Sequence, residues 1–434
     1  MKKNVEAILK KLGVTELNEM QLEAQQIIPK KDNTILLSPT GTGKTIAFLL
    51  PIISNLNADC NEAQVLILAP SRELALQIEQ VCRGMGTGYK VNVVYGGRPI
   101  IKDKEELTTP PTILIGTPGR VADHIRRETI STKHIKTLVL DEFDKSLEIG
   151  FHDDMEDIVS LLDNIEKRVF TSATQMDMLP EFIKIRRPHT IDYLKDTSGS
   201  LKMSVVQTEN KDKLDGLVNL LKSLGSKNGI IFCNFRSTIQ FVADHLDDIG
   251  FNHVSFHGDL EQKERERALI KFRNGTSRLL LATDLAARGI DVPEMDFIIH
   301  YQLPPREEEF IHRNGRTARM HSSGVAYILN WKQADLPDFV QEYDLIKPIP
   351  DKDIPKKEWE TVFISGGRRD KISKGDIAGL FLKQGGLNKE ELGLIELKHD
   401  CAFTAVRKSK AKSLVNTLNN TRLKKKKVRM YIID

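Results

Sequence analysis

The chain has 434 residues, of which 29% are charged and 40% hydrophobic, with a formal net charge of +4. This length predicts two or three domains, each able to bury its own core. The four cysteines lie far apart and form no CxxC pair, so the sequence suggests neither a zinc site nor a disulfide framework, and a reducing cytoplasm fits. No apolar run approaches membrane-spanning length, and the short stripe within residues 1–13 is no secretory signal, so we expect no membrane partner.

A glycine-rich loop, Ser38-Pro39-Thr40-Gly41-Thr42-Gly43-Lys44-Thr45, separates the apolar runs at 34–37 and 46–50. A loop between a strand and a helix points backbone N–H groups and the helix N-terminus at one place, which suits phosphate. Lys44 would reach the outer phosphates, and the Thr45 hydroxyl would bind Mg²⁺. The loop therefore predicts a nucleotide site, although the first glycine of the usual phosphate-loop pattern is missing.

A pair of carboxylates follows the apolar run at 137–140, about a hundred residues later. Asp141, at the strand end, is suited to bind Mg²⁺ through water, and Glu142 to polarise the water that attacks the γ-phosphate of ATP. A solvated acidic turn is the alternative for the pair alone. Its place after an apolar strand and downstream of a phosphate loop favours hydrolysis.

Two similar halves and a basic module make up the chain. Residues 1–200 and 203–346 each alternate apolar strands with helical stretches, which predicts two α/β domains with parallel sheets. The expected strands are 65–68, 91–95, 112–115, 137–140 and 168–171 in the first half, and 229–233, 253–256, 278–282, 297–301 and 325–329 in the second. Residues 347–360 carry prolines that interrupt helix and sheet, so we expect a linker before residues 361–434.

The motifs of residues 12–330 resemble, in their order, those of the DEAD-box RNA helicases. Beside Gln21 and the phosphate loop, they are APSRELA at 69–75, GGR at 96–98, TPGR at 117–120, DEFD at 141–144, SAT at 172–174, IFCNFR at 231–236, ATDLAARGID at 282–291 and HRNGRTAR at 312–319. The resemblance implies two tandem RecA-like domains with an ATPase site in the cleft between them.

The resemblance also implies residue roles. Arg316 and Arg319 would be arginine fingers that stabilise charge on the transferring phosphoryl group when the cleft closes. Gln21 would read the adenine edge and Asp291 would bind the ribose. Coupling of ATP to RNA would involve Ser172, Thr174, Asp144 and His312. RNA contacts that suit phosphates and sugars rather than bases would come from Arg72, Gly97, Thr117, Arg120, Arg236 and Thr283.

The chain departs from the family pattern in three places. Phe143 replaces the alanine of the DEAD motif and is expected to place a large ring beside the acidic pair. Residues 18–20 read Asn-Glu-Met, and no aromatic residue precedes Gln21, so looser nucleotide discrimination is expected. Ala318 replaces the glycine between the fingers, which is tolerated if its φ is negative.

The positive charge is concentrated at the C-terminal end. Residues 361–434 contain 17 Lys and Arg against 7 Asp and Glu, a balance of +10, and the other residues have 47 against 53, a balance of −6. Such a basic module favours a nucleic acid partner. Its strands and helices are expected at 361–365, 374–384, 392–397, 402–406, 409–419 and 428–433, the βαββαβ order of an RNA recognition motif.

Binding by basic loops is expected of this small α+β module, because Phe403 is the main aromatic candidate on its sheet. The candidate RNA contacts are Arg368, Arg369, Lys371, Lys424, Lys425, Lys426 and Lys427. The sequences RDKI at 369–372, KGDI at 374–377, GGL at 385–387 and GLIE at 393–396 resemble the C-terminal domain of the DbpA-like helicases. That resemblance implies large-subunit ribosomal RNA as the partner and bacterial ribosome assembly as the setting.

These observations predict an ATP- and Mg²⁺-dependent RNA helicase that separates short duplexes when its domains close. An ATP-gated RNA clamp would carry the same motifs. A non-catalytic RNA scaffold is disfavoured by Lys44, Glu142, Arg316 and Arg319, and DNA as the substrate is disfavoured by the RNA-type module.

Overall fold

Two units make up the computed structural model, which describes residues 5–39, 41–148, 150–175, 180–183, 185, 187–194, 201–284, 295–317 and 324–433. The first unit comprises the described part of residues 1–200, and the second unit the described part of residues 201–434. No helix among the described residues is long and apolar enough to span a membrane.

The first unit is built on a parallel sheet of seven strands in the order β3-β4-β2-β5-β6-β1-β7. In chain order the strands are β1 (Asn33–Leu37), β2 (Val65–Leu68), β3 (Val91–Val94), β4 (Ile113–Gly116), β5 (Thr137–Leu140), β6 (Lys167–Ser172) and β7 (His189–Asp192). Val65 and Ile67 of β2 enter one hydrophobic core, and Leu66 and Leu68 enter another. The central strands are apolar throughout because both faces of the sheet are covered.

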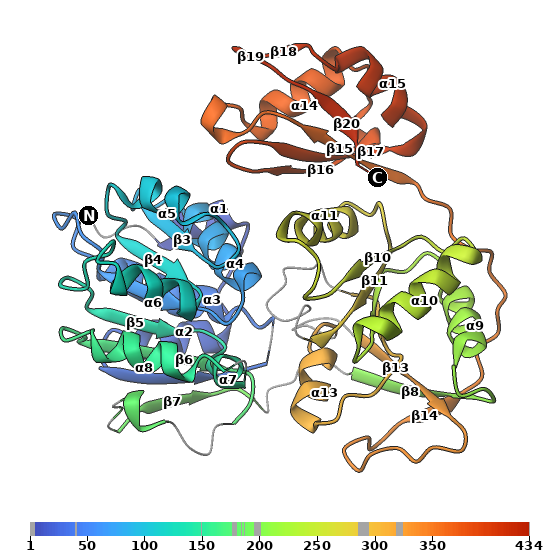
Figure 1. Ribbon diagram of the computed structural model, residues 1–434, viewed down its shortest axis with the longest axis horizontal. Helices are drawn as coiled ribbons and strands as arrows, with labels where there is room; N and C mark the ends of the chain where they lie inside the picture. Colours follow the sequence, from blue (N-terminus) through green and yellow to red (C-terminus); the bar gives the residue numbers. More distant parts are fainter. Residues whose placement is uncertain are drawn as a thin grey trace. The chain divides into compact units, whose positions relative to one another are not determined.

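Helices cover both faces of this sheet (Figure 1). One core receives α1 (Val5–Leu12), α2 (Glu19–Ile27), α3 (Lys44–Ser54) and α4 (Arg72–Gly84). The opposite core receives α6 (Pro118–Arg126), α7 (Phe143–Glu148) and α8 (His152–Ser160), with the short η1 (Glu181–Ile183), and α5 (Ile100–Leu107) follows β3. Each phosphate or acidic motif comes directly after a strand, so these motifs meet at the carboxyl edge of the sheet.

The second unit begins with a similar parallel sheet, in the order β10-β11-β9-β12-β13-β8-β14. Its strands are β8 (Leu201–Thr208), β9 (Gly229–Phe232), β10 (His253–Phe256), β11 (Leu279–Ala282), β12 (Phe297–His300), β13 (Gly324–Trp331) and β14 (Asp344–Ile346). Its helices are α9 (Leu214–Leu224), α10 (Arg236–Asp248), α11 (Gln262–Arg273) and α13 (Glu307–Asn314). The edge strand β14 has no counterpart in the sequence prediction.

The C-terminal module has an antiparallel sheet in the order β16-β17-β15-β20. Its elements are β15 (Trp359–Ile364), η2 (Arg368–Asp370), α14 (Lys374–Lys383), η3 (Lys389–Glu391), β16 (Leu392–Leu397), β17 (Ala402–Arg407), α15 (Lys408–Leu418), a hairpin of β18 (Arg422–Leu423) and β19 (Lys426–Lys427), and β20 (Met430–Ile432). Both helices pack on one face of the sheet through a core that includes Phe381 and Leu414. The predicted fold class, two parallel α/β domains and a small α+β module, is confirmed.

Candidate functional site

The phosphate loop lies between β1 and α3, as the sequence predicts. Gly41 and Gly43 have φ of +86° and +87°, a left-handed conformation that favours glycine. A side chain at Gly43 would overlap the Gln21 amide. The Lys44 ammonium donates to the carbonyls of Ser38 and, at 2.9 Å, Pro39, so it lies inside the loop. Thr42 and Thr45 flank Gly43 and Lys44 in this loop, and Thr40 lies outside the described residues.

The N-terminus of α2 is joined to this loop. Asn18 caps the helix by accepting a hydrogen bond from the Gln21 backbone at 2.9 Å, and the Gln21 side chain accepts from the Asn18 backbone at 3.1 Å. The two side-chain amides then donate to the loop, Asn18 to the Thr42 carbonyl at 3.0 Å and Gln21 to the Gly43 carbonyl at 3.2 Å. Asn18, one of the departures from the family pattern, thus helps to fix the phosphate loop, a role that the sequence analysis missed.

The two carboxylates lie at the carboxyl end of β5 and are buried. The Thr171 hydroxyl donates to the Asp141 carboxylate and accepts from the Glu142 backbone N–H at 3.1 Å. Glu142 has a φ of +47°, an uncommon conformation for a residue other than glycine and one that recurs at active sites. Burial raises the pKa of Asp141, while the Thr171 hydrogen bond and the Lys44 charge act to lower it. Asp141, the backbone of Glu142 and the charge of Lys44 are therefore linked at the carboxyl end of β5.

The Phe143 ring, which was expected beside the acidic pair, enters a hydrophobic core. Phe143 is fully buried in the core under α7 and α8, where it meets Phe170 edge-on with ring centroids 5.6 Å apart. The left-handed turn at Glu142 precedes the first residue of α7, Phe143, whose side chain enters the core. This position therefore contributes to the packing of the core.

The last aspartate of the DEFD segment contacts the SAT segment. Thr174 donates from its hydroxyl to Asp144 at 2.9 Å, and the Ser172 hydroxyl donates to the Thr174 carbonyl at 2.6 Å. The Ser172 oxygen also accepts from the Thr174 backbone at 3.0 Å. Three of the predicted coupling residues, Asp144, Ser172 and Thr174, are therefore joined by hydrogen bonds through Thr174.

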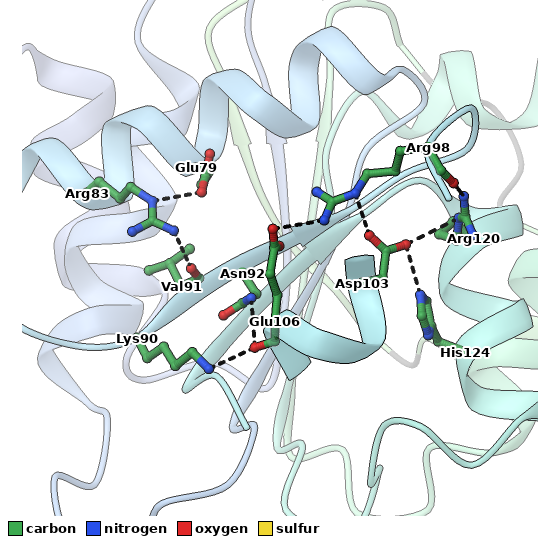
Figure 2. A network of polar contacts seen from close by, with 10 residues as sticks. All are labelled: Glu79, Arg83, Lys90, Val91, Asn92, Arg98, Asp103, Glu106, Arg120 and His124. Atoms are coloured by element: carbon green, nitrogen blue, oxygen red, sulfur yellow. Dashed lines mark hydrogen bonds and ion pairs between the residues drawn. The ribbon is translucent and has the colours of Figure 1, made fainter. Parts of the chain in front are cut away.

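A network of ion pairs joins the GGR and TPGR segments (Figure 2). Its centre is Asp103 of α5, a fully buried carboxylate that contacts Arg98 Nε at 2.7 Å, His124 Nε2 at 3.1 Å and Arg120 Nε at 3.5 Å. Arg120 also donates to the carbonyl of Tyr95, at 3.1 Å, and to that of Arg98. The predicted RNA contact Arg120 thus holds the GGR loop against the start of α6, and Asp103 was missed because it belongs to no motif.

Two more of the predicted RNA contacts meet at this loop. Gly97 has a φ of +86°, and a side chain there would overlap the Arg72 guanidinium. Arg72 begins α4, and Thr117 caps α6. Arg72, Gly97, Thr117 and Arg120 therefore lie near the carboxyl ends of β2, β3 and β4, which are neighbours in the sheet.

In the second unit, Arg313 of α13 joins three motifs. Its guanidinium is fully buried and donates to Asp284 at 2.6 Å, to Asn234 at 2.8 Å and to the Gln302 carbonyl at 2.6 Å. It also lies over the Phe232 ring, 5.1 Å from the ring centroid. The sequence motif predicted arginine fingers in HRNGRTAR but no structural role for Arg313.

The other predicted residues of the second unit differ in their exposure to solvent. Arg316 and His312 are buried near Arg313, at the end of α13 and just beyond it. Arg236 is exposed and pairs with Asp259 at 3.0 Å, and Thr283 follows β11. Arg319 and Asp291, with Ala318, lie outside the described residues.

The lysine run of the C-terminal module forms the β18–β19 hairpin rather than a tail. Lys424 pairs with Asp376 at 2.7 Å and donates to the Lys371 carbonyl at 2.6 Å, and Lys426 pairs with Asp370 at 2.7 Å. The hairpin is thereby tied to η2 and α14. The predicted contacts Arg368 and Arg369 lie in η2 and Lys371 directly follows it. Lys425 lies between β18 and β19, and Lys427 lies in β19.

Comparison with known proteins places these motifs in a family. Residues 18–181 match the DEAD/DEAH box helicase family, residues 212–321 the helicase conserved C-terminal domain, and residues 361–432 the DbpA RNA-binding domain. The ATP-dependent RNA helicase DbpA of Escherichia coli (strain K12) is 30% identical over 98% of this chain and 96% of its own length. The chain belongs to the DEAD-box RNA helicases.

Further relatives agree. This DEAD-box helicase is 29% identical to the ATP-dependent RNA helicase DbpA of Bacillus subtilis (strain 168), over 97% of the chain and 96% of the relative. Among solved structures, S. cerevisiae Dbp5 bound to RNA and ADP BeF3 matches with a TM-score of 0.68 at 27% identity, over 80% of this chain and 94% of that one. The helicase Mss116 bound to ssRNA and UDP-BeF matches with a TM-score of 0.69 at 27% identity, over 77% and 74%. The protein is thus an ATP-dependent RNA helicase with an RNA-binding C-terminal domain.

Proposed function

We propose that this helicase separates short RNA duplexes when ATP closes its two RecA-like domains, and that it acts on large-subunit ribosomal RNA in the cytoplasm during ribosome assembly. The observation that carries the catalytic part is the buried network of Lys44, Asp141, Glu142 and Thr171. We take residues 1–200, 203–346 and 361–434 as the three domains, with residues 347–360 between the last two.

The residues of the first domain fit a magnesium nucleotide. Asp141 is a buried carboxylate. The Thr171 hydrogen bond and the positive charge of Lys44 act to lower its pKa, and a bound cation would act in the same direction. Thr45 and Asp141 would hold Mg²⁺ through water, and the ion would neutralise phosphate charge. Lys44 would bind the outer phosphates and Gln21 the adenine edge, with Asp291 on the ribose.

Glu142 is the proposed general base, which takes the proton of the attacking water. Its left-handed backbone is held by the hydrogen bond to Thr171, so the carboxylate is positioned before the substrate binds. Arg316 and Arg319 are the proposed arginine fingers, which act only when the second domain closes on the first. Hydrolysis would then depend on RNA because closure requires both ligands, and Ser172, Thr174, Asp144 and His312 would carry that coupling.

The substitution Glu142→Gln tests this assignment. The amide keeps the size of the side chain but cannot accept a proton, so RNA-stimulated ATP hydrolysis should fall on the order of 100-fold or more, with ATP and RNA binding retained. Glu105→Gln, on the exposed side of α5, is the control and should hydrolyse ATP like the wild type. Turnover of Glu142→Gln within a few-fold of the wild type would remove Glu142 from the role of base.

A truncated protein ending at Pro350 tests the choice of RNA. Every proposed catalytic group lies before that point, whereas the +10 balance and the match to the DbpA RNA-binding domain lie after it. The truncated protein should hydrolyse ATP when given enough generic RNA, but it should lose preferential stimulation by ribosomal RNA. Its RNA affinity should also depend less on salt, because each lost phosphate contact lowers the slope of log affinity against log salt concentration by about 0.7 to 0.9. Equal preference for ribosomal RNA in both proteins would assign the choice to the helicase core.

A further inference from the structure

The sheet of the C-terminal module carries an aromatic cluster on the face opposite its helices. Phe363 of β15 lies directly across from Phe403 of β17 and from Tyr431 of β20. The ring centroids are 5.5 Å apart for Phe363 and Phe403, and 4.7 Å apart for Phe363 and Tyr431. The sequence analysis considered Phe403 alone, because the pairing of β15 with β20 places residues from opposite ends of the module together.

Part of this face is covered by the second RecA-like domain. Ile270 of helix α11 packs against Phe403 and Ile433 of the module. In the loop after α11, Asn274 and Thr276 form hydrogen bonds with Thr361 at 3.2 and 2.8 Å. Arg273 of α11 pairs with Glu396 at 2.9 Å. Phe403 is consequently only 7% exposed and Thr361 is fully buried. The covered half of the face is therefore an intramolecular interface.

The other half of the face opens into a groove of about 690 Å³ between α11 and the strands β15, β17 and β20. Its aromatic wall is Phe363 and Tyr431, and Phe403 closes its inner end. Tyr431 is 42% exposed, so its ring is accessible to a ligand. The size is that of a site for a flat, nucleotide-sized group.

Positive charge surrounds this aromatic wall. Six cationic side chains line the groove, against the two carboxylates Glu266 and Asp400: Lys263, Arg267, Arg369, Lys426, Lys427 and Arg429. Lys263 and Arg267 come from α11, and the other four cations from the C-terminal module, so cations stand on both sides of the rings. Aromatic faces flanked by cations on both sides are the combination that binds single-stranded nucleic acid.

We propose that this groove binds a segment of single-stranded RNA, with a base stacked on Phe363 and Tyr431 and its neighbouring phosphates on the cations of both domains. A duplex offers phosphates but no unstacked base, so it would not use the aromatic wall. The site shares Arg369, Lys426 and Lys427 with the basic loops expected to hold structured RNA, and it adds the aromatic wall and the cations Lys263 and Arg267 of the helicase core. It would tether a loose strand to the second RecA-like domain. The inference rests on the RNA-binding activity of the proposed function and not on the ribosomal target.

Binding of labelled oligouridine of about 12 nucleotides to the full-length protein, measured by fluorescence anisotropy without ATP, tests the proposal. Tyr431→Ala should raise the Kd about 5-fold or more, because base stacking on an aromatic ring is worth at least that factor. Tyr431→Phe should bind like the wild type, since it keeps the ring. Lys263→Glu, on the α11 side, should also weaken binding and reduce its dependence on salt. Phe241→Ala, a 48% exposed ring on α10, is the matched control and should bind like the wild type.

Photo-cross-linking of the same RNA carrying 4-thiouridine locates the strand. Cross-links to peptides that contain Phe363 or Tyr431, lost in Tyr431→Ala, support the site. Cross-links confined to residues 1–346, together with unchanged Kd values in Tyr431→Ala and Lys263→Glu, overturn it. Either result is independent of the proposed catalytic function, which fails instead if RNA does not stimulate ATP hydrolysis by the wild type.

Discussion

Removal of the Asp103 carboxylate should lower both the stability of the first RecA-like domain and its affinity for RNA. Asp103→Ala leaves the guanidinium groups of Arg98 and Arg120, whose side chains are only 17% and 11% exposed, without their shared anion. Loss of one partner from a buried ion pair costs about 3 to 5 kcal/mol. Arg98 keeps Glu106 at 2.9 Å, a half-exposed partner, so we expect a loss near the lower end, about 3 kcal/mol.

A surface pair in the same domain provides the control. Asp123 bonds to Arg127 at 2.6 Å one helical turn away, in a largely exposed pair. Asp123→Ala should therefore cost at most about 0.5 kcal/mol. Hydrogen exchange of backbone amides in β3 and β4, followed by mass spectrometry of the full-length protein, reports the stability of this domain separately from the others.

The functional result follows from what the carboxylate positions. Through Arg98 and Arg120 it fixes the GGR loop and the start of α6, which carry the proposed RNA contacts Gly97 and Thr117. The KM for RNA in the ATPase assay should rise in Asp103→Ala, while the turnover at saturating RNA and the KM for ATP stay near those of the wild type. Asp103→Glu, which keeps the charge, should recover part of the RNA affinity. Exchange rates and KM values equal to those of Asp123→Ala would refute the reasoning.

Two further predictions concern His300 in the second RecA-like domain and Gly97 in the GGR loop of the first. Burial between Phe232 and Phe310 lowers the pKa of His300 from 6.5 to about 3. Between these pH values the unfolded chain therefore binds more protons than the folded chain. The stability of the second RecA-like domain should fall as the pH drops below about 6.5, by at most about 1.4 kcal/mol per pH unit. Hydrogen exchange of β12 across this range should show a smaller pH dependence in His300→Gln, and an unchanged slope would contradict the assignment. Gly97→Ala forces a side chain onto Arg72 at a φ of +86°, and should raise the KM for RNA but not for ATP, whereas Gly379→Ala, which meets nothing within 4 Å, should change neither. An RNA titration that does not distinguish the two alanine variants would remove the steric argument.

The local structure of this protein follows closely from its sequence. Apolar runs bounded by glycine, proline and polar residues predicted most strands of both parallel sheets but not β7, β8 or β14. The main elements of the C-terminal module were placed within a few residues. The phosphate loop could also be predicted, because its glycines and the lysine at the start of the following helix are adjacent in the chain. Such features depend on neighbours in the sequence, so no knowledge of the tertiary structure is needed to find them.

Other features depend on which strands are neighbours and which face a residue occupies. The order β3-β4-β2-β5 brings Arg98 and Arg120 to one edge, and only there does a carboxylate of α5 become their shared partner. The sequence predicted the Phe143 ring beside the carboxylates, whereas the structure buries it in the core directly after the left-handed turn at Glu142. Phe363 and Tyr431, 68 positions apart, meet because β15 pairs with β20 and side chains alternate along a strand. Long-range pairing leaves no periodic trace in a single sequence, so these arrangements are decided by the tertiary structure alone.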